Sequence, residues 1–357
     1  MMQETTEPAI APVPPEPVRL SKARKLLMEL TQKLQQSKDK KFVLMLVGRT
    51  GVGKSSTINS LLGQEVATVG DFEPSTMRVS YYECELHGIK FDLVDTPGLC
   101  DDLEEVGNDQ EYLAMIKNRV SHIDSMLFVS RLDETRVTGD EKRGIQLISL
   151  AFTPKVWEHA VIVFTHSNAI PADRFLEVVE KRTDLVEREI AHYAGMSIAG
   201  TIPSVAIDNL SKTTPNGEEW LGELYTKVFV RISQGGTLPF LLATAQDLVP
   251  PQAYPPGIEH TQAGQPIPMG SPLSPPFILG QTGGTLPTPI DSSAPQEPRI
   301  KLNQEQKQEI KKKIDSYIIS GLSTVGVGIG ASFYGPLGAS IGGAIGAVIG
   351  LILWLWS

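Results

Sequence analysis

The chain has 357 residues and a formal net charge of −9. Domains that bind nucleic acids are usually basic, so this charge argues against a nucleic-acid partner. There are only two cysteines, which is too few for a disulfide framework or a four-cysteine metal site. The length suffices for one domain of ordinary size with extensions, or for two domains.

The N-terminal residues differ in composition from the rest of the chain. Residues 1–19 are rich in Pro, Glu and Ala and predict a disordered arm, because such a composition cannot bury a core. In residues 20–37, leucines recur at helical spacing between Lys, Glu and Gln. We expect an amphipathic helix there that packs on the edge of the following domain. Binding to a membrane surface or to a partner is the alternative for this helix.

A phosphate-binding motif lies at the start of that domain. The stretch KFVLMLVGRTGVGKSSTINSLL contains the complete pattern G-x-x-x-x-G-K-[ST] between an apolar run and a helical pattern. The glycines let backbone N–H groups approach phosphate oxygens, and the helix N-terminus adds a positive dipole end. The alternative, a glycine-rich turn that happens to carry a lysine, does not account for this context. The predicted phosphate-binding residues are Gly48, Arg49, Thr50, Gly51, Val52, Gly53, Lys54, Ser55 and Ser56, together with Gly98 further along the chain.

From Phe42 to about residue 235, apolar runs alternate with helical patterns. Val79–Leu86 is more polar and suits an edge strand beside the apolar run at 89–94, with a turn at His87 and Gly88. Thr138 and Glu141 form a predicted capping box for one of the helices. Such alternation predicts an α/β three-layer fold with a mostly parallel sheet for residues 38–235.

A second motif, Asp95-Thr96-Pro97-Gly98, follows the apolar run at 89–94. An Asp at the end of a strand beside the phosphate loop is placed to hold Mg²⁺ through water, and Gly98 is placed to donate its N–H to a γ-phosphate. This is the D-x-x-G element of P-loop GTPases. We expect Ser55, Thr76 and Asp95 to serve the metal, with Thr68 as the alternative to Thr76.

The base-binding pattern departs from the N-K-x-D of most GTPases. The apolar run before residue 165 leads instead into Thr165-His166-Ser167-Asn168. His166 is predicted to stack on a purine, and Asp208 to accept hydrogen bonds from guanine. The alternative for His166 is an exposed loop residue with no role.

Taken together, these motifs resemble a known family. GRTGVGKSSTINSLLG, DTPGL, the Thr-His pair, and the segments DSMLFVSRLDETRV, IDN and NGEEW resemble the AIG1-type, septin-related GTPases. Within these, the chain is most similar to the Toc GTPases, the import receptors of the chloroplast outer envelope. The resemblance covers about residues 40–235. It implies that His166 replaces N-K-x-D as the base stacker, that Asp208 and Asn209 contact guanine, and that Arg136 reaches the partner's phosphates across a dimer.

The resemblance also implies ligands and partners. GTP or GDP with Mg²⁺ are the expected cofactors, and the expected assembly is a homodimer, or a heterodimer with a related GTPase, through the nucleotide face. Leu99 occupies the position where many small GTPases carry a water-orienting Gln, which predicts slow hydrolysis.

The C-terminal third predicts attachment to a membrane. Residues 236–298 are expected to be a Pro/Gly-rich linker, and residues 299–316 a basic juxtamembrane helix. Residues 317–357 are apolar and Gly-rich and predict a membrane anchor, either a single transmembrane helix or a hairpin. The alternative is a buried pair of Gly-rich helices.

Three functions are compatible with this organisation. The first is a membrane-anchored switch or receptor for precursor-protein cargo in plastid-type import. The second is a membrane scaffold or remodelling GTPase that oligomerises through the GTPase domain and tail. The third is an ATP-using P-loop enzyme. The GTPase domain would face the cytosol, on the chloroplast outer envelope in a plastid-bearing eukaryote and otherwise on a bacterial inner membrane.

Overall fold

The computed structural model describes residues 29–65, 80–96, 113–114, 117–118, 120, 122–249, 297–317 and 343–356. The predictions for the arm at 1–19, for Thr76 and for Gly98 lie outside these residues.

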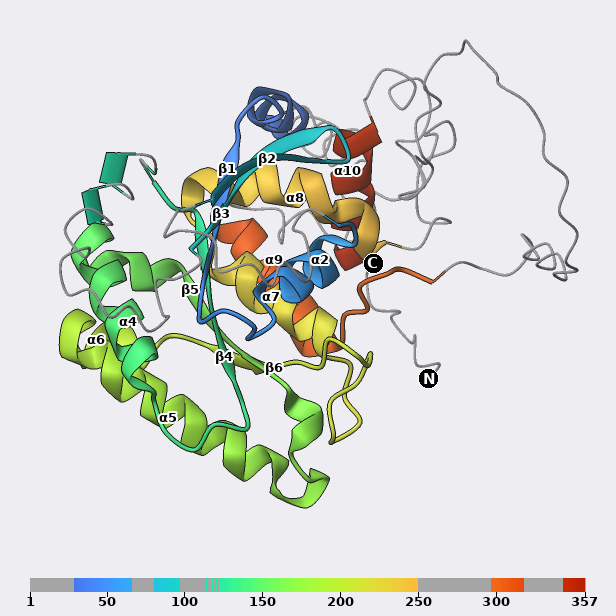
Figure 1. Ribbon diagram of the computed structural model, residues 1–357. Coiled ribbons are helices and arrows are strands. Elements are labelled where there is room, and N and C mark those ends of the chain that lie inside the picture. Colours follow the sequence, from blue (N-terminus) through green and yellow to red (C-terminus); the bar gives the residue numbers. More distant parts are fainter. Residues whose placement is uncertain are drawn as a thin grey trace, which may run out of the picture.

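The described residues form a six-stranded sheet with the order β2-β3-β1-β4-β5-β6 (Figure 1). The strands are β1 (Phe42–Val47), β2 (Ser80–Leu86), β3 (Ile89–Asp95), β4 (Ser125–Arg131), β5 (Ala160–Thr165) and β6 (Ser204–Ala206). β2 is antiparallel to β3, and the other neighbouring strands are parallel. The prediction of an α/β fold with a mostly parallel sheet and an antiparallel edge strand is confirmed.

Helices cover both faces of the sheet. They are α2 (Lys54–Leu62), α4 (Gly139–Phe152), α5 (Phe175–Ala194), α6 (Met196–Ala199), α7 (Trp220–Arg231), α8 (Gln234–Leu248), α9 (Gln304–Tyr317) and α10 (Gly343–Trp356), with short 3₁₀ helices η1 (Pro154–His159), η2 (Ser167–Ala169) and η3 (Ala172–Arg174). A further helix spans residues 29–37, and its Leu30 and Leu34 are buried in the core.

The central strand β1 shows why the sequence there is apolar at every position. Phe42, Leu44 and Leu46 join the core beneath α2, α7 and α8, whereas the residues between them join the core beneath α4 and α5. A parallel strand buried on both faces cannot alternate with polar residues. The two cores hold β1 and β3 in register, which brings Leu46 opposite Asp95 at the carboxyl end of the sheet.

The predicted linker at 236–298 is wrong at its start, because α8 runs through it. α8 is buried along most of its length and contacts both β1 and β3. Its segment GTLPFLLATAQ carries no charge, and it forms a helix that is apolar all round because the sheet covers one side and α10 the other. Ser233 caps the helix by accepting a hydrogen bond from Gly236 N at 3.1 Å.

Residues 297–317 return to the α/β domain. The Arg299 guanidinium pairs with Asp247 of α8 at 3.0 Å and donates to the Ser60 and Leu61 carbonyls at the end of α2 at 2.7 and 2.8 Å. Ile300 is fully buried, and its N–H donates to the Asp247 carbonyl at 2.9 Å. The segment predicted as a basic juxtamembrane helix is therefore part of the folded domain.

The helix α9 within that segment packs on α7. Asn303 caps this helix by accepting a hydrogen bond from Gln306 N at 2.9 Å. Ile310 and Ile314 are buried, and Lys313 donates to the Val230 and Ile232 carbonyls at the end of α7. The lysine satisfies carbonyls that have no partner within the helix.

The helix α10 lies along α8 (Figure 1). It has 14 residues, and its Ala347, Val348 and Leu351 are fully buried. Lys307 of α9 lies 4.1 Å above the ring of Trp354. In the part of the chain that the structure describes, no helix combines the length and the apolar character needed to cross a membrane, so the transmembrane helix or hairpin expected over 317–357 is not found there.

Candidate nucleotide site

The phosphate loop joins the end of β1 to the start of α2. Gly48, Gly51 and Gly53 have φ values of +154°, +77° and +95°. A Cβ atom on Gly48 would lie 2.3 Å from the Val129 carbonyl oxygen of the neighbouring strand. The first glycine is therefore required for close packing against β4 as well as for its backbone conformation. The loop has the positive-φ backbone that a phosphate-binding turn needs.

Lys54 is the cation of this loop. Its side chain is buried, and Nζ donates to the Gly48 carbonyl at 2.9 Å and the Arg49 carbonyl at 3.0 Å. The amine is thus held inside the ring of the loop, where phosphate oxygens would meet it. Ser55 and Ser56 follow in the first turn of α2 and are partly buried. Thr50 is exposed, and Val52 is buried beneath the loop.

Asp95, at the end of β3, is the carboxylate of the site. Its Oδ1 is buried and has no hydrogen-bond partner. Burial raises the pKa of Asp95, and the nearby charge of Lys54 partly opposes this rise. Next to it, Thr96 is fixed by donating its hydroxyl to the Leu46 carbonyl at 2.9 Å. A buried carboxylate oxygen without a partner is placed to accept from a ligand or its water.

The donors present fit Mg²⁺. Among the described residues, no group of three or more His, Cys, Asp and Glu side chains is placed to hold a metal ion. Mg²⁺ in nucleotide sites needs no such group, because it keeps several waters and binds phosphate oxygens with one or two protein ligands. The Ser55 hydroxyl and the unpaired Asp95 Oδ1 would supply those ligands.

His166 follows β5 in a left-handed conformation with a φ of +57°. Its Nδ1 lies 3.0 Å from the Thr165 hydroxyl. The pKa of His166 is lowered, first by burial and then by the charge of Arg131. The ring is therefore neutral at physiological pH, which suits stacking on a purine. The charge of Asp208 acts on His166, so the two predicted base-binding side chains lie at the same edge.

Asp208 and Asn209 differ in what they contact. Asp208 is buried, and its Oδ1 accepts from Leu210 N at 2.9 Å, which shapes the turn after β6. Asn209 instead reaches α2 and donates to the Thr57 hydroxyl at 3.3 Å. Its Oδ1 is buried and unpaired. Asn209 thus contacts the helix that follows the phosphate loop, a role that the motif did not reveal.

The sequence also missed Thr165 as a connecting residue. Its hydroxyl contacts the Val52 carbonyl of the phosphate loop at 2.6 Å and the Ser130 carbonyl of β4 at 3.2 Å. It therefore ties the phosphate loop to the edge where the base-binding residues are predicted. Its only signal in the sequence is its place just before His166.

Arg136 lies in the segment between β4 and α4. Its side chain is exposed and makes no hydrogen bond or ion pair with the described residues. Glu134, two residues earlier, pairs with Arg49 of the phosphate loop at 2.7 Å. The structure therefore brings Arg136 to the same edge of the sheet as the phosphate loop, with its guanidinium free to meet another molecule.

The comparisons with known proteins agree with these motifs. A model of the AIG1 family matches residues 42–198. Translocase of chloroplast 34 from Pisum sativum is 30% identical over an alignment of 214 residues, and the match covers 56% of this chain and 68% of that protein. Translocase of chloroplast 33 from Arabidopsis thaliana is also 30% identical, over 56% of this chain and 71% of that protein.

Other matches differ in coverage. Translocase of chloroplast 108 from Physcomitrium patens is 29% identical over 66% of this chain but only 24% of its own length, so the chain spans about a quarter of that relative. A crystal structure of Toc33 from Arabidopsis thaliana in complex with GDP and Mg²⁺ is 27% identical, with a TM-score of 0.46 over 61% of this chain and 92% of that one. On the sequence relationships, the chain belongs to the AIG1 family, a family of GTPases.

Proposed function

We propose that the chain binds GTP with Mg²⁺ and hydrolyses it slowly, as a switch. The observation that carries this proposal is the phosphate loop, in which Lys54 is enclosed by its own loop. The charge of Lys54 acts on Asp95, whose Oδ1 is buried and unpaired. Hydrolysis of GTP is phosphoryl transfer, in which a protein contributes mainly positioning and charge neutralisation. These residues supply a cation and a Mg²⁺-binding carboxylate.

The residues of the site divide between the phosphates, the metal and the base of GTP. Lys54 and the loop N–H groups would hold the phosphates, with Gly98 as a further N–H donor. Ser55 and Asp95 would hold the metal, aided by Thr76. Mg²⁺ would neutralise charge on the β- and γ-oxygens when bound. His166 would stack on guanine, and Asp208 would accept from the N1–H and the exocyclic N2 amine of guanine through the oxygen that Leu210 does not use.

Nucleotide titrations test this assignment. Lys54→Ala should abolish GTP binding, because the buried amine is the only lysine in the loop. Retained micromolar affinity would contradict the phosphate-loop assignment. Equal displacement of bound GTP by ATP and by unlabelled GTP would contradict the base site while leaving the phosphate loop intact.

The proposed switch includes a dimer across the nucleotide face, homomeric or with a related GTPase. The support is Arg136, which is exposed and lies two residues after the carboxylate that contacts the phosphate loop. In the relatives atToc33 and psToc159, dimerisation is important for the GTPase activity. In this chain, hydrolysis per molecule should rise with protein concentration, and Arg136→Ala should remove that rise without loss of GTP affinity.

The wider role we propose is a receptor at a membrane surface in plastid-type protein import. The support is the identity to translocases of chloroplast, together with the uncharged stretch at 337–356. For a bilayer to receive this stretch, α10 would have to leave α8. GTP-dependent binding of transit-type precursor peptides would support import, whereas clustering of liposomes by the chain would support a scaffold instead.

A further inference from the structure

The segment between β4 and α4 is joined to the phosphate loop and to α5 through one carboxylate. We propose that Glu134 is a positioning residue that holds the Arg136 segment against the phosphate loop, so that the action of Arg136 on a partner depends on the conformation of that loop. This inference rests on the proposed dimer and names the device that couples it to the nucleotide site.

The two ends of the segment are fixed independently of Glu134. Leu132 is buried, and its N–H donates to the Thr165 carbonyl at 2.9 Å. Thr138 caps α4 in a capping box, in which its hydroxyl accepts from Glu141 N at 3.2 Å and its N–H donates to the Glu141 carboxylate at 2.9 Å. Between these ends Asp133 pairs with Arg131 of β4 at 2.7 Å, whereas Arg136 makes no hydrogen bond or ion pair with the described residues. The Glu134 carboxylate is therefore the group that ties this segment to the phosphate loop and to α5.

Arg49 provides that contact from the phosphate loop. Its Nη1 lies 2.7 Å from Glu134 Oε1, and its Nε lies 3.4 Å from Asp140 Oδ2. The two carboxylates flank Arg136, one on each side along the chain. Arg49 was predicted as a phosphate-binding residue, but its side chain points to this segment. A shift of the phosphate loop on binding nucleotide would therefore move the segment with it.

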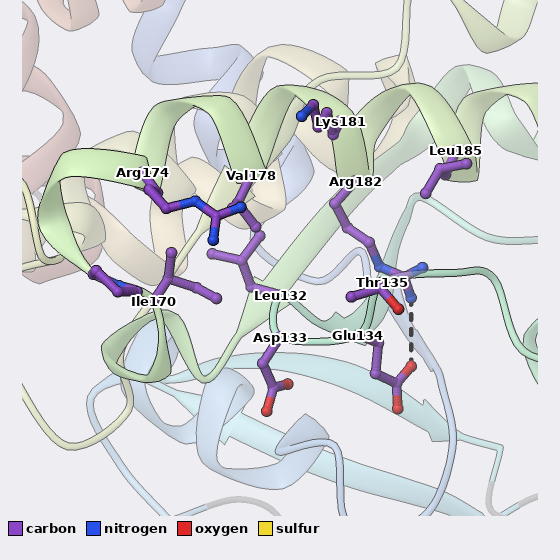
Figure 2. A pocket seen from close by; sticks show the side chains of 11 residues that line it. Leu132, Asp133, Glu134, Thr135, Ile170, Arg174, Val178, Lys181, Arg182 and Leu185 are labelled. Carbon is purple, nitrogen blue, oxygen red and sulfur yellow. Dashed lines mark hydrogen bonds and ion pairs between the residues drawn. The ribbon is translucent and has the colours of Figure 1, made fainter.

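Arg182 of α5 holds the same carboxylate from the other side. Its Nη2 lies 3.5 Å from Glu134 Oε2, 2.7 Å from Glu141 Oε1 and 2.8 Å from Ser130 Oγ. Figure 2 shows Arg182 directed from α5 towards Glu134, across a pocket of about 250 Å³. The Arg182 side chain is only 1% exposed, so this guanidinium is a rigid support rather than a solvated one.

These contacts decide which variant is informative. Replacing Arg182 would leave the buried Glu141 without its cation, and a buried charge stripped of its partner is strongly destabilising. The Glu134 side chain is 22% exposed, so Glu134→Gln keeps its shape, removes its charge and spares the fold. Asp184→Asn is the matched control, because Asp184 is an exposed acid on α5 whose ion pair among the described residues is with Arg188 at 3.8 Å.

The experiment measures GTP affinity, and GTP hydrolysis per molecule against protein concentration, for the full chain. We expect Arg136→Ala to remove the concentration-dependent rise in hydrolysis and Glu134→Gln to reduce it about tenfold, since small misplacements of a catalytic group cost one to two orders of magnitude. Glu134→Gln should keep the wild-type GTP affinity and the wild-type rate of hydrolysis at the lowest protein concentration. Asp184→Asn should behave as wild type.

Variants of Arg49 provide a second test should Glu134→Gln fail to fold. Arg49→Gln should lose the rise of GTP hydrolysis with protein concentration. Arg49→Lys, which keeps the charge opposite Glu134, should recover a large part of that rise. A full rise in Glu134→Gln, or a loss of GTP affinity that matches its loss of rate, would overturn the positioning role. If the wild-type chain binds GTP but its hydrolysis per molecule does not rise with protein concentration, the proposed dimer is refuted, and the positioning role of Glu134 with it.

Discussion

The phosphate-binding edge of the sheet and the C-terminal segments are encoded in different ways. At the edge, function depends on backbone conformations that few residue types adopt, so Gly48, Gly51 and Gly53 in sequence correspond to positive φ in the fold. In the C-terminal segments, α8, residues 297–317 and α10 are placed by contacts with residues far away along the chain. Where the structure describes them, stretches whose composition suits a linker or a membrane anchor pack into the hydrophobic core.

Arg299 illustrates the second kind of encoding. It contacts residues 52 and more than 230 positions earlier in the chain, at Asp247 and at the end of α2. Through it, the segment that follows the Pro-rich stretch is attached to the helix that begins at the phosphate loop. No local pattern around residue 299 signals such a contact. We therefore expect substitutions in the phosphate loop to change stability through local backbone geometry. Substitutions in the C-terminal segments should change stability through the packing of those segments on the rest of the domain.

The largest effect is expected from Gly48→Ala. The added Cβ would lie 2.3 Å from the Val129 carbonyl oxygen, and neither backbone can give way without breaking the packing of β1 on β4. We expect a loss of about 3 kcal/mol in the free energy of unfolding, from overpacking together with backbone strain. Denaturant unfolding of the full chain measures it.

Gly51→Ala is the matched control for that substitution. Gly51 also has a positive φ, but a Cβ there would meet nothing within 4 Å. Only the strain of a left-handed residue remains, about 1–2 kcal/mol. Equal losses at the two positions would mean that the Val129 contact does not matter and that the loop is defined by φ alone.

A smaller effect is expected from Gly222→Ala in α7, where the substitution should lower the free energy of unfolding although Gly→Ala in a helix usually raises it. In an open helix, Gly→Ala stabilises by about 1 kcal/mol. Here the Cβ would lie 2.1 Å from the Lys301 carbonyl oxygen, so the docked segment must shift. We expect a net destabilisation of about 1–2 kcal/mol, together with faster hydrogen exchange in α9.

Gly139→Ala in α4 provides the comparison, because a Cβ there would meet nothing within 4 Å. Its stability should be unchanged or slightly raised. If Gly222→Ala were stabilising as well, residues 297–303 would not be packed on α7 in solution, and the C-terminal segment would be the free juxtamembrane helix that its charge pattern predicts.

Features that depend on local sequence could be predicted, whereas features that depend on contacts between distant residues could not. The sheet, its antiparallel edge, the capping box at Thr138 and the positive-φ glycines of the phosphate loop were predictable, because each depends on local pattern or on backbone chemistry. The bridging roles of Glu134, Arg182 and Thr165 were not, since their partners lie 35 to 113 residues away or on another element. The helix α8 was missed because an uncharged segment before a Pro-rich stretch lacks the polar face that marks a surface helix.

The smallest effect is a pH dependence at Lys313. Burial, with the charge of Arg231, lowers the pKa of Lys313 to about 8 from its ordinary 10.5. Between these values the unfolded chain binds a proton that the folded chain does not, so stability rises with pH across the window. Because the side chain keeps two carbonyl partners, we expect the free energy of unfolding to gain about 1–2 kcal/mol between pH 8 and pH 10, measured as the difference between wild type and Lys313→Met.

The control is Lys312→Met, at an exposed neighbour, which should keep the wild-type dependence of the free energy of unfolding on pH. Equal slopes for both variants would mean that Lys313 stays in water and that α9 does not dock on α7.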